Sequence, residues 1–326
     1  MDINYGLLSS YIISLLLMIG LPIALGYFVI RYLKVSWWVV FTGVLTFIGS
    51  QLLRIPASYG LSSLFQTGAI PAPSATWIPV FNGLVAGLLA GVFEETARLV
   101  GFMFLKKKAR PFKSSIGLGV GHGGIESILL GILGTGTTLA SVLFYNAGAQ
   151  LAKGTSTQEI QYVLAQIQQF WTTSWHFGLL PGVERVIALS IQIVLSIMVW
   201  KAIVDRQWLW FVLAILYHTF VNAISVYLTQ IGWGYWAVEG VLAIFLVINL
   251  FVIYNSWKEE TAIEADEEFE DDDHDDDDDD EDDEDDGDND EANEDDEAEE
   301  NEDDEVELEG DGGEVSNTPN EDTEEE

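Results

Sequence analysis

Polar side chains one helical turn apart recur in three apolar stretches of the sequence. They are Glu94 and Arg98 with Glu95 beside them in FEETARLV, His122 and Glu126 in GHGGIES, and His218 and Asn222 in HTFVN. In a helix, residues i and i+4 lie on one face, so each pair presents both side chains to the same neighbour. Ionisable groups are expensive to place inside a membrane-spanning helix, which makes these residues functional candidates.

The three stretches are expected to place their polar groups at one depth. Counted from the nearest basic residue at the end of its stretch, each of Glu94, His122, Glu126 and His218 lies 9 to 13 residues away. At 1.5 Å per residue, these side chains would lie about 14–20 Å below the same surface. We therefore predict that they converge; unrelated polar contacts between helices are the alternative.

Carboxylates, imidazoles and an amide at one depth permit three kinds of chemistry. In the first, Glu94 deprotonates a water that His122 helps to hold, while donors on His218 and Asn222 bind the oxyanion of a peptide carbonyl. In the second, Glu94, His122 and His218 hold a zinc ion whose open position takes a water. In the third, the same groups relay protons during transport. The sequence contains no cysteine, which excludes thiolate ligands and a cysteine nucleophile.

Four further charged residues in the apolar stretches are expected to support the site. They are Arg98, Glu126, Glu184 and Arg185. Arg98 shares a helical stripe with Glu94 and is expected to lie beside it. Glu184 and Arg185 lie nearer the outer surface, where a structural salt bridge is the favoured interpretation.

A ridge of small residues precedes the two glutamates. Gly83, Gly87 and Gly91 recur every four residues, which lets another helix approach closely. Glu95 continues this ridge by one turn and is expected to face that helix, whereas Glu94 lies about 100° around the helix axis. Close packing is the favoured interpretation of the glycines, and access for an extended peptide is the functional alternative.

Seven apolar stretches are long enough to cross the hydrocarbon core, which takes roughly 20 helical residues. They cover 6–30, 36–54, 77–104, 115–135, 183–204, 208–229 and 234–256. The sequence therefore predicts an all-α, multi-pass membrane protein. Most Lys and Arg residues follow the odd-numbered stretches, so the positive-inside rule places the N-terminus outside and the C-terminus in the cytoplasm. Arg54 and Lys153 are assigned to the outer side.

Two further segments have informative patterns. Residues 157–171 place apolar side chains at helical spacing opposite Gln and Glu, which predicts either a helix in the outer interface or a short helix packed on the loop. The apolar stretch from Ser115 to Asn146 would make about 48 Å of helix, too long for one straight crossing. Because glycines interrupt it, a break or tilt is expected near 134–138.

Charge divides the chain into two parts. Residues 258–326 hold 44 of the 52 acidic residues and one of the 14 basic ones. The negative sign of the chain's formal net charge of −38 therefore comes from this segment. Such a composition buries too little apolar surface to form a core. We predict a polytopic transmembrane domain at 1–257 and a disordered, Asp/Glu-rich cytoplasmic tail at 258–326.

The polar motifs, in their order along the chain, resemble those of a known family. EETAR, GHGGIE and the HxxxN string are similar to the motifs of the CAAX-prenyl-protease and bacteriocin-processing group of intramembrane peptidases, and most closely to its bacterial YhfC family. By this resemblance, Glu94 is the catalytic glutamate and Glu95 its neighbour. His122, His218 and Asn222 complete the implied site. The resemblance covers about residues 1–255.

Two positions depart from the wider group. Arg98 comes one residue earlier than its motif arginine, and Leu118 stands where a Phe is usual. The wider group is described as glutamate-dependent, although YhfC members have also been labelled metalloproteases. We favour a glutamic-type, metal-free reaction, because a buried Arg98 beside Glu94 would oppose a divalent cation. Zinc held by Glu94, His122 and His218 is the alternative.

The sequence therefore predicts an intramembrane endopeptidase that hydrolyses a peptide bond of a membrane-associated protein or peptide. Its partners would be the lipid bilayer and that substrate, with no nucleic acid and no cofactor other than the alternative zinc. A multi-pass location in a bacterial plasma membrane is expected. The competing class is a non-proteolytic transporter, or an immunity or scaffold protein, that uses the same buried groups.

Overall fold

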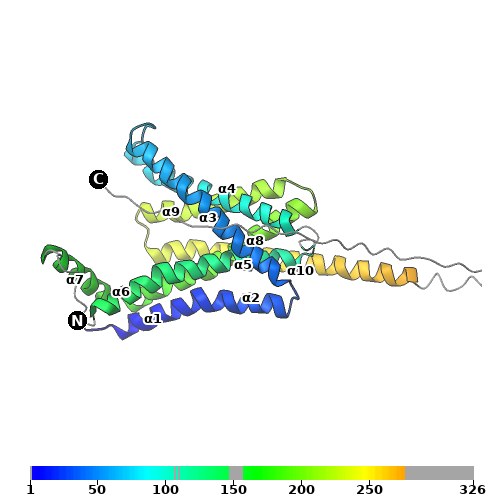
Figure 1. Cartoon of the computed structure of the whole chain (residues 1–326), viewed down its shortest axis with the longest axis horizontal. Coiled ribbons are helices and arrows are strands. Elements are labelled where there is room, and N and C mark those ends of the chain that lie inside the picture. Colours follow the sequence, from blue (N-terminus) through cyan, green and yellow to red (C-terminus); the bar gives the residue numbers. More distant parts are fainter. Residues whose placement is uncertain (1, 106–107, 109–110, 147–156, 276–326) are drawn as a thin grey trace, which may run out of the picture. The chain divides into compact units, whose positions relative to one another are not determined.

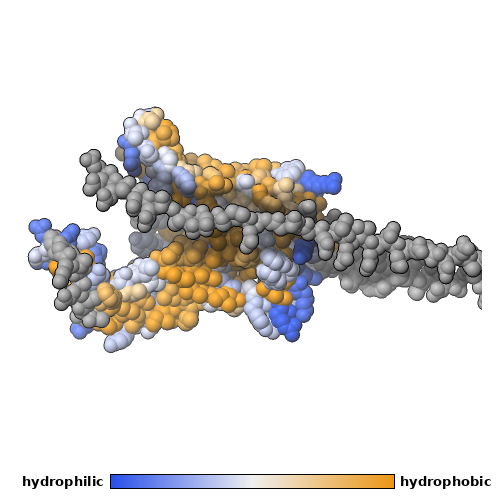
Figure 2. Space-filling view, in the orientation of Figure 1, coloured by the Kyte–Doolittle hydropathy of each residue, from blue (hydrophilic) through white to orange (hydrophobic). Residues whose placement is uncertain are grey.

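The computed structural model describes residues 2–105, 108, 111–146 and 157–275, and the regular elements within these ranges are all helices. Seven spans in the described part are long and apolar enough to cross a membrane, which confirms the predicted all-α, multi-pass architecture. They are Tyr5–Arg31, Trp37–Gln66, Ala75–Leu105, Lys113–Tyr145, Trp175–Val204, Leu209–Gln230 and Tyr235–Ile263. On the face in Figure 2, apolar residues form a belt over the middle of the helices, with hydrophilic residues towards its ends.

Five long helices carry the predicted site residues or contact those that do. They are α3 (Trp37–Gln66), α4 (Ile78–Leu105), α5 (Lys113–Leu130), α8 (Leu180–Val204) and α9 (Leu209–Gln230). Helix α5 packs against α3 and α8, while α4 packs against α3 and α9. Figure 1 shows α3 crossing the other helices obliquely.

Helix α5 is buried along most of its length because small residues let its neighbours approach. A Cβ on Gly121 would meet the backbone of Val40 in α3. A Cβ on Gly119 would meet the backbone of Ile193 in α8. The glycines around His122 therefore let α5 pack closely against its neighbours, and the imidazole is fully buried.

The glycine ridge of α4 faces α9. Added Cβ atoms on Gly83, Gly87 and Gly91 would each meet a backbone carbonyl oxygen of α9. The ridge therefore brings the two helices into backbone contact, which confirms the packing interpretation. One turn further along the same face, Glu95 contacts His218 of α9, as expected from its position on the ridge.

The second span is longer than the sequence suggested. α3 continues through Pro56 to Gln66, so Arg54 lies inside the helix rather than in an outer loop. The predicted end at residue 54 was wrong because a charged residue was taken as the boundary of the apolar stretch. Four other basic residues used for the orientation lie outside the described residues: Lys106, Lys107, Arg110 and Lys153. The outside location of the N-terminus stays a prediction.

Two π-helical segments interrupt the first and fourth spans. The segment Gly131–Gly136 joins α5 to α6 (Thr137–Asn146), close to the break predicted at 134–138. The segment Leu16–Gly20 joins α1 (Tyr5–Leu15) to α2 (Leu21–Arg31). Met18, in the first of these spans, accepts a hydrogen bond from Ser127 and receives the Thr135 hydroxyl at its sulfur. The irregular turns of the two spans thus pack on each other.

The amphipathic segment after the fourth span forms α7 (Thr157–Thr172). Its buried side chains, Ile167 and Trp171, pack with Leu7 of α1 and Val142 of α6. At least this part of its apolar face therefore packs on protein, in line with the second of the two predicted alternatives.

The last helix, α10 (Tyr235–Asp275), passes the predicted domain boundary at residue 257 without a break. Residues 258–275 are thus helical here, contrary to the expectation that the tail begins unstructured at Lys258. Lys201 of α8 lies 3.7 Å from Glu259 and 4.0 Å from Glu260, so ion pairs tie this extension to the bundle. The compact unit that holds all seven spans covers Met1–Asp272. Residues 276–326, most of the predicted disordered tail, lie outside the described residues.

Candidate active site

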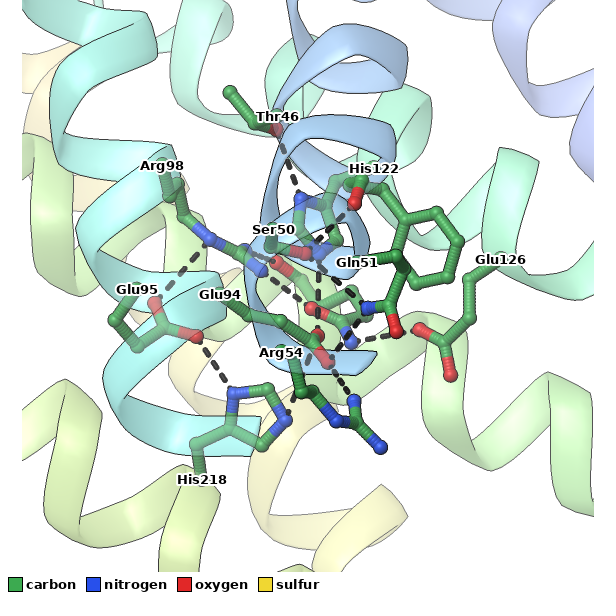
Figure 3. A network of polar contacts seen from close by, with 12 residues as sticks. Thr46, Ser50, Gln51, Arg54, Glu94, Glu95, Arg98, His122, Glu126 and His218 are labelled. Atoms are coloured by element: carbon green, nitrogen blue, oxygen red, sulfur yellow. Dashed lines mark hydrogen bonds and ion pairs between the residues drawn. The ribbon is translucent and has the colours of Figure 1, made fainter. Parts of the chain in front are cut away.

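Two of the predicted residues, His122 and His218, face the carboxylate of a third, Glu94. Glu94 of α4 is only 2% exposed. Its Oε2 lies 3.3 Å from Nε2 of His122 on α5 and 3.8 Å from Nε2 of His218 on α9 (Figure 3). The predicted convergence of the three helices is therefore confirmed for Glu94, His122 and His218, whereas Glu126 contacts Arg185 and Gln192 instead. The two oxygens of Glu94 differ, since Oε1 faces α3, where Arg54 pairs with it.

The hydrogen bonds of His218 identify its protonated nitrogen. Its Nδ1 lies 2.7 Å from Oε1 of Glu95. An ionised carboxylate can only accept, so Nδ1 carries the proton and donates it to Glu95. In the neutral imidazole, Nε2 then has a lone pair, which faces Glu94.

His122 is oriented in the same way by α3. Its Nδ1 lies 2.8 Å from the hydroxyl oxygen of Thr46, and that hydroxyl donates its single proton to the Gly43 carbonyl at 2.7 Å. Nδ1 of His122 is thus held by Thr46, and Nε2 lies within hydrogen-bond distance of Oε2 of Glu94, at 3.3 Å. Both imidazoles thus point Nε2 at the same carboxylate oxygen.

Three facing electron-pair donors need a proton or a cation between them, and this donor set suits a metal ion. Two His nitrogens and a carboxylate oxygen are common zinc ligands, and a ligating His usually donates its other N–H to a carboxylate or another acceptor. Tetrahedral ligands at about 2 Å from zinc lie roughly 3.4 Å apart, close to the 3.3 Å and 3.8 Å found here. Among the described residues, no three such side chains already enclose a metal position.

Arg98 does not lie beside Glu94, and this part of the prediction was wrong. Its Nε lies 3.2 Å from Oε2 of Glu95, and its other nitrogens donate to α8. The acceptors are the backbone and side-chain oxygens of Gln192, at 2.6 Å and 2.5 Å, and the Ser196 hydroxyl at 2.6 Å. Shared helical spacing with Glu94 could not reveal these acceptors on another helix. Arg98 holds Glu95, which in turn orients His218.

Helix α3 supplies site residues that the sequence reasoning missed. Arg54 pairs with Glu94, the Gln51 amide donates to the same Oε1 at 3.4 Å, and Thr46 orients His122. A signal was present, since Ser50 and Arg54 stand four residues apart in an apolar stretch, like the other pairs. It was passed over because the predicted span ended at Arg54.

A polar cavity of about 280 Å³ opens beside the cluster. Its lining residues that carry polar side chains are Arg54, Glu94, Glu126, Glu184, Arg185, Gln192, His218, Asn222 and Ser225. Asn222 is half-buried on this wall, and within the described part of the chain its amide has no hydrogen-bond partner. His122 does not line the cavity and is fully buried behind Glu94.

The predicted salt bridge on α8 exists and reaches further than expected. Arg185 contacts Glu184 at 2.5 Å and Glu126 of α5 at 2.8 Å. The Gln192 amide donates to the second oxygen of Glu126 at 2.8 Å. These contacts fix one wall of the cavity and leave the Arg185 guanidinium occupied by two carboxylates.

Comparison with known proteins agrees with this arrangement. A family model described as "YhfC intramembrane metalloprotease" matches residues 15–245, well over half of the chain. This chain belongs to the YhfC family. It is similar to a Bacillus subtilis (strain 168) protein named "Uncharacterized membrane protein YhfC", with 29% identity over 245 residues. That alignment covers 72% of this chain and 91% of the relative. No solved structure matches the chain.

The YhfC match includes every residue of the cluster and ends within α10, before the acidic segment. The predicted resemblance to the YhfC family is thus confirmed, as is the multi-pass membrane location. The family description names a metalloprotease and gives no support to a glutamic-type reaction.

Proposed function

We propose that this chain is an intramembrane metallopeptidase whose reaction takes place at Glu94, His122 and His218. The observation that carries this proposal is the matched orientation of the two imidazoles, each with Nδ1 held by a fixed hydrogen-bond partner and Nε2 directed to Oε2 of Glu94. This arrangement leaves three donor atoms directed at one point. It agrees with the metalloprotease description of the family.

The metal ligands would be these three side chains, and zinc suits them best. When bound, zinc supplies a Lewis acid that lowers the pKa of a coordinated water to about 7. Glu95 and Thr46 keep the imidazoles in the ligating tautomer. Arg98 holds Glu95 in place from the side of α8.

The substrate is a peptide segment that reaches the cavity in an extended form. A cavity of about 280 Å³ accommodates a few residues of a chain but not a folded helix. The Asn222 amide on its wall is free to bind a peptide carbonyl or N–H group. The cluster lies within the membrane spans, so the substrate is a membrane-associated protein or peptide.

A metal-free, glutamic-type reaction is the second candidate. It is consistent with the Arg54–Glu94 ion pair, which keeps Glu94 in the ionised form that a general base requires, without any metal. In this reaction Glu94 itself removes a proton from water, as a general base. Both candidates use Glu94, so they differ in metal dependence rather than in the location of the site.

The test uses purified protein in detergent and a library of fluorogenic peptides taken from membrane-protein segments. We expect cleavage by the wild type, and at least 100-fold slower cleavage by Glu94→Gln and His218→Ala. Glu259→Gln and His176→Ala are matched controls outside the cluster and keep the wild-type rate. Turnover retained by both cluster variants, or no cleavage of any peptide by the wild type, overturns the proposal.

Chelation then separates the two candidates. Exhaustive treatment with 1,10-phenanthroline is expected to abolish cleavage, and added zinc to restore it. Full activity after chelation, in a sample shown by elemental analysis to contain no transition metal, assigns the reaction to Glu94 alone.

A further inference from the structure

Arg54 pairs with the oxygen of Glu94 that the histidines do not contact. It pairs with Oε1, whereas both imidazole nitrogens face Oε2. A guanidinium in this position leaves the ligating side of the carboxylate open. In Figure 3 its planar head lies beside Glu94, next to His218.

Besides the Asn222 amide, few hydrogen-bond donors in the cavity lining are not already engaged. The sequence pattern suggested His218 as a donor to an oxyanion, but its Nδ1 is engaged by Glu95 and its Nε2 faces Glu94. Arg185 is occupied by Glu126 and Glu184. Within the described residues, the side chain of Arg54 hydrogen-bonds to Glu94 alone, although a guanidinium has five N–H donors.

Arg54 also has access to the cavity. Its side chain is 33% exposed, against 3% for that of Glu94, and it forms part of the cavity lining. The N–H groups not used by Glu94 are therefore available to a group bound in the cavity. A planar, permanently charged fork of donors suits a carbonyl oxygen that gains negative charge.

We propose that Arg54 is a further catalytic residue, which binds the carbonyl oxygen of the scissile peptide bond and stabilises the oxyanion that forms on it. This inference rests on the proposed peptidase function. Arg54 then takes the role of oxyanion donor that the sequence suggested for His218, and Asn222 binds the neighbouring backbone of the substrate.

Peptide hydrolysis with Arg54 in this role has two stages, addition of water to the carbonyl and cleavage of the C–N bond. The water oxygen forms a bond to the carbonyl carbon and loses one proton, while the C=O π electrons move to the oxygen held by Arg54. The oxyanion then returns this electron pair to the carbon, and the C–N bond breaks. The leaving amine nitrogen takes up the proton that the water lost. Arg54 keeps its own protons throughout, because a guanidinium does not deprotonate at neutral pH.

Substituting Arg54 should therefore affect the transition state more than substrate binding. Removing one oxyanion donor typically lowers kcat by about 10²–10³-fold. For Arg54→Gln we expect a kcat loss in this range with KM changed by less than about threefold. Arg54→Lys keeps the positive charge beside Glu94 but loses the planar set of N–H donors. Its kcat should lie between those of the wild type and Arg54→Gln. Arg31→Gln, on an exposed arginine at the end of α2, is the control and keeps the wild-type kcat.

Two further measurements separate this role from a structural one. A phosphinic peptide, whose tetrahedral anion resembles the oxyanion, should bind Arg54→Gln about 100-fold more weakly than wild type, while the cleaved product peptide binds equally well. Millimolar guanidinium should restore part of the activity of Arg54→Ala. If Arg54→Gln does not fold in detergent, Arg54→Lys decides, and a wild-type kcat in that variant overturns the proposal.

The outcomes distinguish this inference from the proposed function. If Glu94→Gln and His218→Ala abolish cleavage while Arg54→Gln keeps the wild-type kcat and phosphinate affinity, only the role of Arg54 is wrong. If the Glu94 and His218 variants keep their activity, the peptidase site itself is wrong.

Discussion

His218 donates its Nδ1 proton to Glu95 across the contact between α9 and α4, at 2.7 Å, and both side chains are more than nine-tenths buried. The acceptor is itself held by Arg98. Glu95 and Arg98 together thus fix the orientation of the His218 imidazole.

Replacing Glu95 should weaken metal binding without removing a ligand. Glu95→Gln leaves a weaker, neutral acceptor for the His218 proton, and loss of such an outer partner typically costs 10–100-fold in metal affinity. Zinc competition against a chromophoric chelator measures this change. The wild-type affinity in this variant would contradict the role of Glu95 as an orienting group.

The hydroxyl of Thr46 should be required for His122. Thr46→Val keeps the volume but removes the acceptor for the Nδ1 proton, so we expect roughly a tenfold loss of metal affinity or kcat. Thr46→Ser keeps the hydroxyl and is the matched control, with near wild-type behaviour. Equal effects of Val and Ser would show that packing at this position matters rather than the hydrogen bond.

Backbone contact between α4 and α9 should tolerate no side chain at Gly87. Its added Cβ would meet the Thr219 carbonyl oxygen, one residue from His218, so Gly87→Ala must push the helices apart. We expect a loss of about 1–3 kcal/mol in stability, seen as a lower thermal midpoint in detergent, together with slower cleavage. A Cβ on Gly26 has no heavy atom within 4 Å, so Gly26→Ala is the control.

Removing Arg98 alone should be more damaging than removing its whole ion pair. Arg98→Met leaves Glu95 as a fully buried, uncompensated charge, which typically costs about 3–5 kcal/mol. The double variant Arg98→Met, Glu95→Met should unfold at a higher temperature than Arg98→Met alone. Additive losses in a double-mutant cycle would mean that the two side chains do not stabilise each other.

The sequence was sufficient to identify the seven spans and one residue of each pair that converges on the site. Apolar length identified the spans, and i, i+4 spacing with similar depth brought Glu94, His122 and His218 together. The same spacing gave the wrong partner for Arg98, because a long side chain can turn away from its own face of the helix to acceptors on another helix. Nothing local to Arg98 in the sequence indicates Gln192 and Ser196 as those acceptors.

Two boundaries were harder to predict for a related reason. Arg54 and Lys258 were both taken as the end of an apolar stretch, yet α3 and α10 continue past them. A helix ends where its backbone hydrogen bonds stop rather than where hydropathy falls, and partners can retain a charged residue within it. Glu94 does so for Arg54, and Lys201 pairs with the glutamates just beyond Lys258.

The four charged side chains at the centre form two ion pairs, Glu94 with Arg54 and Glu95 with Arg98. The formal charges of this cluster therefore cancel, which reduces the cost of holding it among apolar helices. Any single charge-removing substitution leaves one unbalanced charge there, whereas removal of an anion with its cation partner preserves neutrality. Natural replacements at these four positions should accordingly change in oppositely charged pairs.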